Sequence, residues 1–293
     1  MLKIGVINNM PPAAIRSAER QFSEILTAAA RDDIPFEIKW FRFVGVRPEH
    51  YGQMADLWES ELDGLIVTGA EPKAALLQDE PVWEPLTRTI DWAARHTTSA
   101  IWSCLAAHAA VLHLDGVERC PRDVKIFGVF DSIKSADHAI FANTQAVWRV
   151  PHSRWNDLPE QALDASGYKV LAKSHTAGVD TFIKQIERSL FVFIQSHPEY
   201  EAASLMREYQ RDVTRFHLGQ QERYPNVPLN YFDSQIAARL EALRDDPTNQ
   251  DEGRELLERV QMENSWKPVT IQVYRNWLGY LLQHSRTLTP AAS

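Results

Sequence analysis

The chain has 293 residues, of which 44% are hydrophobic and 24% are charged, and its formal net charge is −8. This composition is typical of a globular protein with a substantial core, and the negative charge argues against nucleic-acid binding, which needs a basic surface. Apolar runs stay shorter than a membrane-spanning helix, so we expect no membrane association.

The chain contains two cysteines, Cys104 and Cys120, whose spacing suits neither a disulfide framework nor a metal site. We therefore expect no bound metal and a cytoplasmic setting in which a reactive thiol survives. The start at residues 1–7 reads as a strand and is too short for a signal peptide.

Apolar segments alternate with amphipathic segments through the first half of the chain. Strands are predicted at 3–7, 36–43, 62–67 and 100–104, and helices at 17–30 and 83–95. This alternation predicts an α/β fold with a doubly wound, mostly parallel sheet covered by helices on both faces. Ligands of such sheets bind at the carboxyl ends of the strands.

Shorter strand-like runs follow in the middle of the chain, and helices follow in its last third. The runs at 128–130, 145–150, 168–172 and 178–183 are separated by turn residues and predict an antiparallel extension of the sheet. Helices are predicted at 201–218, at 269–284, and twice within 234–262 with a break at 245–249. The end, 285–293, reads as frayed.

The most informative stretch is the segment 101–110, in which an apolar strand ends on Cys104 and a helix-favouring run starts at once. A strand-to-helix turn of this kind mounts a nucleophile at the edge of a sheet, and the field of the helix N-terminus favours the thiolate. The alternative is a buried cysteine that acts only as a small hydrophobic residue.

A second apolar strand, at 191–196, leads to His197 and Glu199. A cysteine, a base and a residue that orients the base, in this chain order, predict a nucleophilic triad. His175 is a competing base, but it lies in a polar loop that no strand precedes. His108 follows the cysteine by one helical turn and is interpreted as structural or pocket-lining.

Other polar positions suggest roles in ligand binding, each with an ordinary structural alternative. The glycine turn at Gly69 and Ala70 could form an oxyanion hole with the Leu105 N–H, or be a simple turn. Lys125 could hold a substrate anion, or extend its charge to solvent. Arg211 could clamp a carboxylate, or pair on the helix surface. The segment 151–154 could bind a polar ligand at the end of its strand.

These residues fall within ordered motifs that together resemble one family, the homoserine O-acyltransferases of methionine biosynthesis, which share the class I glutamine amidotransferase fold. The resemblance covers residues 4–232 and resumes at 274–283. It rests on the segments 9–11, 19–22, 64–70, 125–129, 151–154, 197–200, 207–212, 227–232 and 276–278, and on the turn at 104. It implies a flavodoxin-like acyltransferase domain at 1–232 and a C-terminal helical segment at 233–293 that packs on the same domain.

The resemblance also implies roles for these residues in a ping-pong reaction. Cys104 takes the acyl group from acyl-CoA as a thioester, His197 is the general base, and Glu199 orients it. The co-substrate is succinyl-CoA or acetyl-CoA, no cofactor stays bound, and the product is O-acyl-homoserine. The implied substrate-binding positions are Lys125, Ser153 and Arg211, with Arg154 and Glu208 beside them; Arg211 holds the amino acid's carboxylate.

The sequence departs from the usual family pattern at several positions. The lysine expected soon after Met10-Pro11 is missing, and Arg16 is the nearest substitute. Lys73 stands at the position that separates succinyl from acetyl donors, and its charge favours a dicarboxylic acyl group. Leu105 and His108 replace a tryptophan and a glutamine, and the segment 234–262 differs from the family's usual stretch.

Three alternatives stay open at this point. The acceptor could be another hydroxy amino acid such as serine, the enzyme could be a glutaminase-type amidotransferase or cysteine hydrolase, or the chain could only bind a ligand. The amidotransferase alternative is weakened because the residues after Cys104 lack that pattern's glycine and glutamine. The partners expected are small-molecule substrates and, because family members are usually dimeric, a second copy of the chain.

Overall fold

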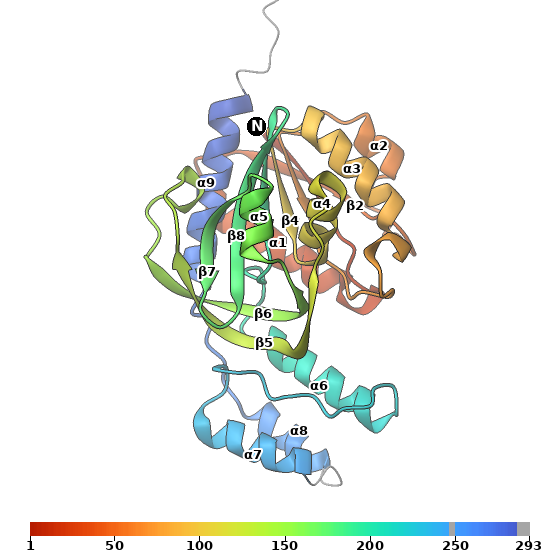
Figure 1. The fold of residues 1–293 in the computed structure, drawn as a ribbon, viewed down its shortest axis with the longest axis vertical. Helices are drawn as coiled ribbons and strands as arrows, with labels where there is room; N and C mark the ends of the chain where they lie inside the picture. Colours follow the sequence, from red (N-terminus) through yellow and green to blue (C-terminus); the bar gives the residue numbers. More distant parts are fainter. Residues whose placement is uncertain (246–249, 286–293) are drawn as a thin grey trace, which may run out of the picture.

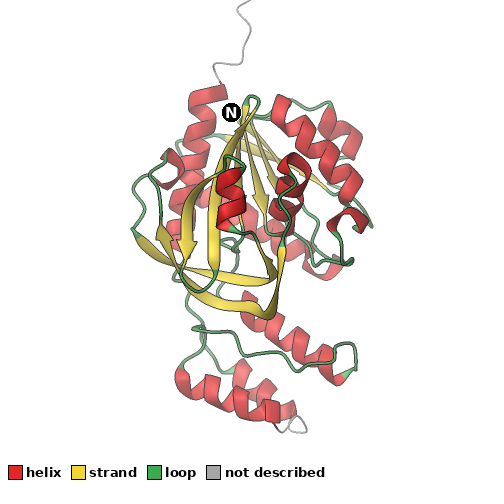
Figure 2. Ribbon diagram, viewed as in Figure 1, coloured by secondary structure: helices red, strands yellow, loops and turns green. Residues whose placement is uncertain are grey.

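The computed structural model of the chain describes residues 1–245 and 250–285. The described residues form a nine-stranded sheet in the order β2-β1-β3-β4-β9-β8-β7-β5-β6 (Figures 1 and 2). Neighbours pair in parallel from β2 to β9 and antiparallel from β9 to β6. The predicted mostly parallel sheet with an antiparallel extension is confirmed. In chain order the strands are β1 (Leu2–Ile7), β2 (Phe36–Phe41), β3 (Gly64–Val67), β4 (Ser99–Ser103), β5 (Cys120–Lys134), β6 (Val147–Asp157), β7 (Lys169–Ser174), β8 (Gly178–Ile186) and β9 (Ser189–Ile194).

Helices cover both faces of the sheet (Figure 1). On one face, α1 (Ile15–Ala30) and α9 (Lys267–Ser285) contact each other and share a hydrophobic cluster with β1. On the other face, α3 (Trp83–His96), α4 (Leu105–Asp115) and the short α5 (Glu160–Ala165) share a second cluster. The stripe of Phe22, Ile25, Leu26 and Ala29 on α1 is buried, as its helical spacing predicts.

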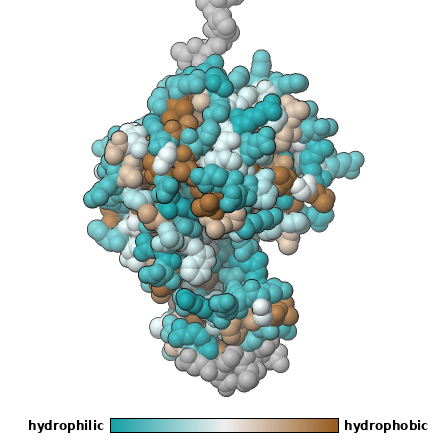
Figure 3. Space-filling model, turned by 45° about the vertical axis from the view of Figure 1, so that its right-hand side comes forward, coloured by the Kyte–Doolittle hydropathy of each residue, from teal (hydrophilic) through white to brown (hydrophobic). Residues whose placement is uncertain are grey.

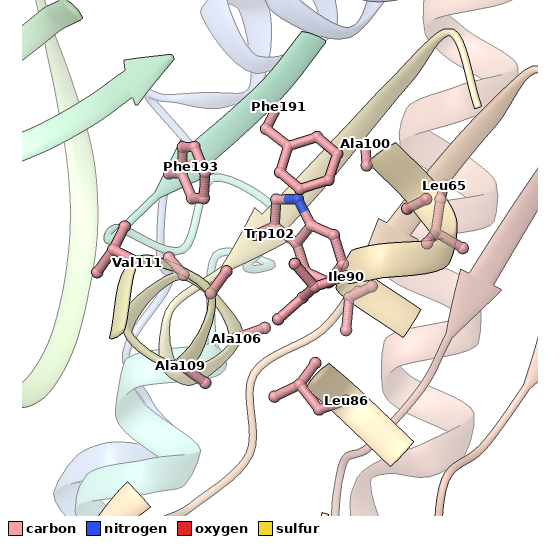
Figure 4. Close-up of a cluster of buried hydrophobic side chains, with 14 of the residues drawn as sticks. Leu65, Leu86, Ile90, Ala100, Trp102, Ala106, Ala109, Val111, Phe191 and Phe193 are labelled. Atoms are coloured by element: carbon pink, nitrogen blue, oxygen red, sulfur yellow. The ribbon is translucent and has the colours of Figure 1, made fainter. Parts of the chain in front are cut away.

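The packing beneath α4 fixes the position of the turn that precedes it. Trp102 of β4 lies against Phe191 of β9, with ring centroids 5.1 Å apart, and α4 adds Ala106 and Ala109 to the same buried cluster (Figure 4). Because these α4 residues are small, the helix approaches the sheet closely. The start of α4 is therefore held at the end of β4.

The middle of the chain corrects the predicted element bounds. The segment 151–154, predicted at the end of a strand, lies inside β6, which runs on to Asp157. β6 is the outermost strand of the sheet, so the missing N–H of Pro151 is tolerated there. The sequence prediction also missed α2 (Met54–Trp58) and α5, which are too short to show a helical period.

The C-terminal part adds three helices near the carboxyl end of the sheet, α6 (Ser204–His217), α7 (Ser234–Asp245) and α8 (Gln250–Glu258). They lie below the sheet in Figure 1, and Leu240 and Leu257 pack with Tyr209 in a third hydrophobic cluster. Two helices do lie within 234–262, as predicted, whereas the break beyond residue 245 and the tail at 286–293 lie outside the described residues. The domain boundary at residue 232 stays a prediction.

On the face drawn in Figure 3, hydrophilic residues predominate and hydrophobic residues form small, separate patches. In the part of the chain that the structure describes, no helix has both the length and the apolar character needed to cross a membrane.

Candidate active site

Cys104 forms the whole turn between β4, which ends at Ser103, and α4, which begins at Leu105. Its backbone angles are φ 49° and ψ −111°, a conformation that costs a residue with a side chain about 1–3 kcal/mol. The Cys104 N–H donates to the Ile194 carbonyl at 2.7 Å, which ties the turn to β9. Cys104 is partly exposed and is not sealed within the core.

The glycine turn after β3 passes directly over this cysteine. A Cβ added to Gly69 would lie 3.0 Å from the Cβ of Cys104 and 3.3 Å from the backbone nitrogen of Leu105. Only glycine allows this approach without a shift of the turn. The Leu105 N–H belongs to the first turn of α4, where no intrahelical acceptor exists. The backbones of the β3 turn and of the α4 N-terminus therefore meet beside Cys104.

His197 and Glu199 follow the carboxyl end of β9, the strand next to β4. The Nδ1 atom of His197 lies 2.9 Å from Oε1 of Glu199, and both side chains are largely buried. A further hydrogen bond from the His197 N–H to the Pro151 carbonyl, at 2.8 Å, fixes the backbone. Because Glu199 binds Nδ1, Nε2 is the imidazole nitrogen that remains to exchange a proton with a reaction partner.

The charge state of His197 couples it to the nucleophile. Burial disfavours the charged imidazole, but the charges of Glu199 and Cys104, and hydrogen bonds to both, raise the pKa of His197 well above 6.5. The thiol and the imidazole therefore interact across the edge of the sheet. A protonated imidazole beside a thiolate is the activated form of a Cys–His pair.

A group of polar side chains continues from this pair toward α6. The ring of Tyr200 stacks on His197 with centroids 4.4 Å apart, and its hydroxyl donates to Glu208. The hydroxyl of Ser153 also donates to Glu208, at 2.6 Å. Lys125 lies 3.7 Å from that carboxylate and 3.2 Å from Asp212. Predicted substrate-binding residues from β5, β6 and α6 therefore meet beside the His–Glu pair.

Arginines complete this polar group. The Nε atom of Arg211 donates to Asp212 at 2.8 Å. Arg215 lies 3.8 Å from Asp212 and forms two hydrogen bonds with Glu71, at 2.6 and 3.0 Å. These bonds to Arg215 are the first cause of the lowered pKa of Glu71. The site thus holds cations and carboxylates side by side, as a zwitterionic ligand requires.

Arg154 occupies a different place from the one predicted for a ligand contact. It is only 4% exposed and bonds the carbonyls of Asn156 and Ala177 and the carboxylate of Asp157. These partners take up both terminal nitrogens of its guanidinium. Arg154 therefore supports β6 beneath the site rather than facing open space.

The other two histidines considered for the site, His108 and His175, lie in different surroundings. His108 is buried and bonded to Gln195 at 2.8 Å, and burial lowers its pKa to about 3, so it is a neutral structural group. His175 is exposed in the turn between β7 and β8. His197, whose pKa Cys104 helps to raise, therefore stays the predicted base.

The two cations expected to select the donor lie at the surface. Arg16 is exposed in the first turn of α1, and the side chain of Lys73 is exposed in the loop after β3. The backbone N–H of Lys73 donates to Glu80 at 2.7 Å, which holds that loop in place. Their roles stay predictions.

The sequence reading did not assign Tyr200, Asp212, Arg215 or Glu71 to the site. Helical spacing could have indicated two of them, because 208, 212 and 215 fall on one face of α6 with Arg211 beside them. No pattern in the sequence shows that Glu71 faces Arg215, a pair 144 residues apart. Within residues 1–245 and 250–285, no three His, Cys, Asp or Glu side chains group as a metal site.

Solved structures similar to this chain include glutamine amidotransferases. One from Methylobacillus flagellatus aligns with a TM-score of 0.54 at 15% identity and covers 95% of this chain and 94% of its own. Another, from Thermotoga maritima, gives 0.51 at 13% identity over 96% and 98%. These likenesses show that the chain has an α/β fold of the kind found in glutamine amidotransferases.

The sequence, unlike the fold, determines the family. The family model described as homoserine O-succinyltransferase matches residues 1–288. Proteins named homoserine O-succinyltransferase are 46% identical in Rhodopseudomonas palustris, over 83% of this chain and 75% of that protein, and 40% identical in Bradyrhizobium japonicum, over 96% and 90%. The chain belongs to the homoserine O-succinyltransferase family, and it is an acyltransferase.

Proposed function

We propose that the chain transfers the succinyl group of succinyl-CoA to the hydroxyl of homoserine, through a thioester on Cys104. Family membership supports the overall reaction. The observation that carries the mechanism is the placement of a strained, accessible cysteine beside a histidine that is bonded to Glu199 at 2.9 Å.

In the first half-reaction, the Cys104 thiolate attacks the thioester carbonyl of the donor. The carbonyl oxygen becomes negative and accepts hydrogen bonds from the N–H groups of Leu105 and of Gly69 or Ala70. The bond to the CoA sulfur then breaks, and the imidazolium of His197 gives that sulfur its proton. Cys104 is left acylated and His197 neutral.

In the second half-reaction, neutral His197 takes the proton of the acceptor hydroxyl, whose oxygen attacks the Cys104 thioester. The Cys104 thiolate leaves, and the imidazolium–thiolate pair is restored. Acylation removes the thiolate charge that helps to raise the pKa of His197. The same group therefore changes from acid to base between the two steps.

The polar group beside Tyr200 suits the acceptor amino acid. Arg211 would exchange its bond to Asp212 for the ligand carboxylate, and Glu208 and Asp212 would face the ammonium group. Lys125 and Ser153 hold these two carboxylates in place. Lys73 and Arg16 would attract the anionic donor over longer range. The homodimer and the cytoplasmic setting stay predictions.

The half-reactions can be tested separately by intact-mass measurement. Succinyl-CoA alone is expected to add one succinyl group to the protein, and homoserine is then expected to release it as O-succinylhomoserine. A donor preference for acetyl-CoA, or faster release by serine, would contradict the proposed substrates. Ammonia release from glutamine without any acyl adduct would contradict acyl transfer itself.

Glu199 is a positioning residue whose removal should be visible in the pH profile. Because its carboxylate raises the pKa of His197, Glu199→Gln is expected to lower that pKa. The acid limb of deacylation by homoserine then moves to lower pH, while the plateau rate falls roughly 100-fold because the base is weaker and poorly oriented. Single-turnover deacylation of succinyl-enzyme across pH measures both effects. A lower plateau with an unmoved limb would show that Glu199 acts only in packing.

A further inference from the structure

The loop after β3 is held in a fixed path beside the nucleophile. The loop contacts Cys104 at Gly69 and then runs away from it. Further along, the carboxylate of Glu80 accepts hydrogen bonds from the backbone N–H groups of Lys73 and Ala74, at 2.7 and 2.9 Å. Glu80 is only 7% exposed. The backbone is therefore anchored at 73–74, while the Lys73 side chain points to solvent.

Arg119 contacts this loop from the segment that joins α4 to β5. It precedes β5, is partly buried, and its Nη2 atom donates to the Ala75 carbonyl at 3.1 Å. Burial lowers the pKa of Arg119, whereas the charges of Glu80 and Cys104 oppose that effect. Its charge also acts on His108, one helical turn after Cys104. The guanidinium thus contacts the loop whose residue Gly69 packs on Cys104, and its charge interacts with that of Cys104.

Arg119 forms no ion pair with the other described residues of the site. Among the described residues it has no carboxylate within 4.0 Å, and its hydrogen bond is to a neutral carbonyl. Lys125, Arg211 and Arg215, in contrast, are paired with carboxylates. A guanidinium has five N–H donors, and a partly buried one is stabilised by an anionic partner. The Glu80 oxygen that is nearest the loop already accepts two N–H groups.

We propose that Arg119 binds the terminal carboxylate of the succinyl group, on the donor and then on the Cys104 thioester. This inference rests on the proposed function, because it requires an acyl group on Cys104. A succinyl group carries its carboxylate only two methylene groups beyond the reacting carbonyl, so its receptor must lie near the sulfur. Arg119 binds the loop that packs on Cys104 at Gly69, and its planar guanidinium matches a carboxylate. Lys73, exposed on the anchored loop, contributes only long-range attraction.

The test compares succinyl-CoA with butyryl-CoA, whose acyl chain has the same length and no charge. The rate of Cys104 acylation at subsaturating donor is measured by intact mass for the wild type, Arg119→Met, Arg119→Lys and, as a matched surface control, Lys73→Met. Arg119→Met is expected to slow acylation by succinyl-CoA about 10- to 100-fold, as for loss of a charged hydrogen bond. Acylation by butyryl-CoA should change less than about threefold, and Arg119→Lys should recover part of the loss.

The outcomes separate this inference from the function on which it rests. Equal slowing of both donors by Arg119→Met would assign Arg119 to the CoA moiety or to loop packing and would overturn the inference. A loss of discrimination in Lys73→Met but not in Arg119→Met would overturn it as well. If the wild type forms no adduct with any CoA donor, the proposed function fails first. Preserved butyryl transfer in Arg119→Met excludes a folding defect as the cause.

Discussion

Cys104→Ala is expected to abolish both the thioester and turnover. Removal of the sulfur leaves no nucleophile at the turn, and a loss of at least about 10⁴-fold in kcat is the usual result when a covalent residue is removed. Intact mass after incubation with succinyl-CoA should show unmodified protein, and a coupled assay for free CoA should show the lost turnover. Activity near the wild-type level in Cys104→Ala would contradict covalent transfer.

A second substitution at this position controls for damage to the fold. Cys104→Gly should be as inactive as Cys104→Ala, yet more stable by about 1 kcal/mol, because glycine adopts the positive φ of the turn without strain. Urea unfolding of the two variants measures this difference. A less stable glycine variant would show that the backbone at 104 is not strained. A loss of activity accompanied by the expected stability order is a loss of chemistry alone.

The parts of the fold that local pattern determines were predicted well. The strand before Cys104 and the strand before His197 are fully buried and apolar, so their period is clear and both lie in the parallel sheet. The small residues that follow Cys104 indicate close helix packing, and α4 begins where they begin. In each case the residues of the element itself determine its type and its bounds.

The parts that depend on distant segments could not be predicted. The segment 151–154 is predicted at the end of a strand, whereas the edge position of β6 tolerates Pro151 and the strand runs on to Asp157. Arg154 and Arg211 are both cations in the sequence. Arg154, however, is buried and bonds backbone carbonyls, so it stabilises β6 and does not face a ligand. Arg119 gave no signal in the sequence, because its position near Cys104 depends on the return of the chain after α4. The sequence shows which residues are charged, but the partners of each charged side chain depend on the fold.

His197→Asn is expected to separate the two half-reactions. An asparagine can keep the hydrogen bond to Glu199 that Nδ1 of His197 makes now, but it removes Nε2 and with it the base. Transfer from the succinyl-enzyme to homoserine should fall about 10²- to 10⁴-fold, the usual contribution of a general base. The variant should also lose the rise of that rate with pH, because the wild-type rate rises as imidazolium becomes neutral.

Acylation of His197→Asn should be affected less than transfer to homoserine. The substitution removes the cation that pairs with the Cys104 sulfur but keeps the nucleophile itself, so the succinyl adduct should still form, more slowly than in the wild type, while its transfer to homoserine is lost with the base. His175→Gln is the matched control, because its ring is exposed in the turn between β7 and β8, and it should leave both rates unchanged. Slow transfer in His175→Gln together with wild-type transfer in His197→Asn would exchange the roles of the two histidines. The buried His–Glu pair beside the cysteine would then have no part in proton transfer, and the mechanism above would fail at its second step.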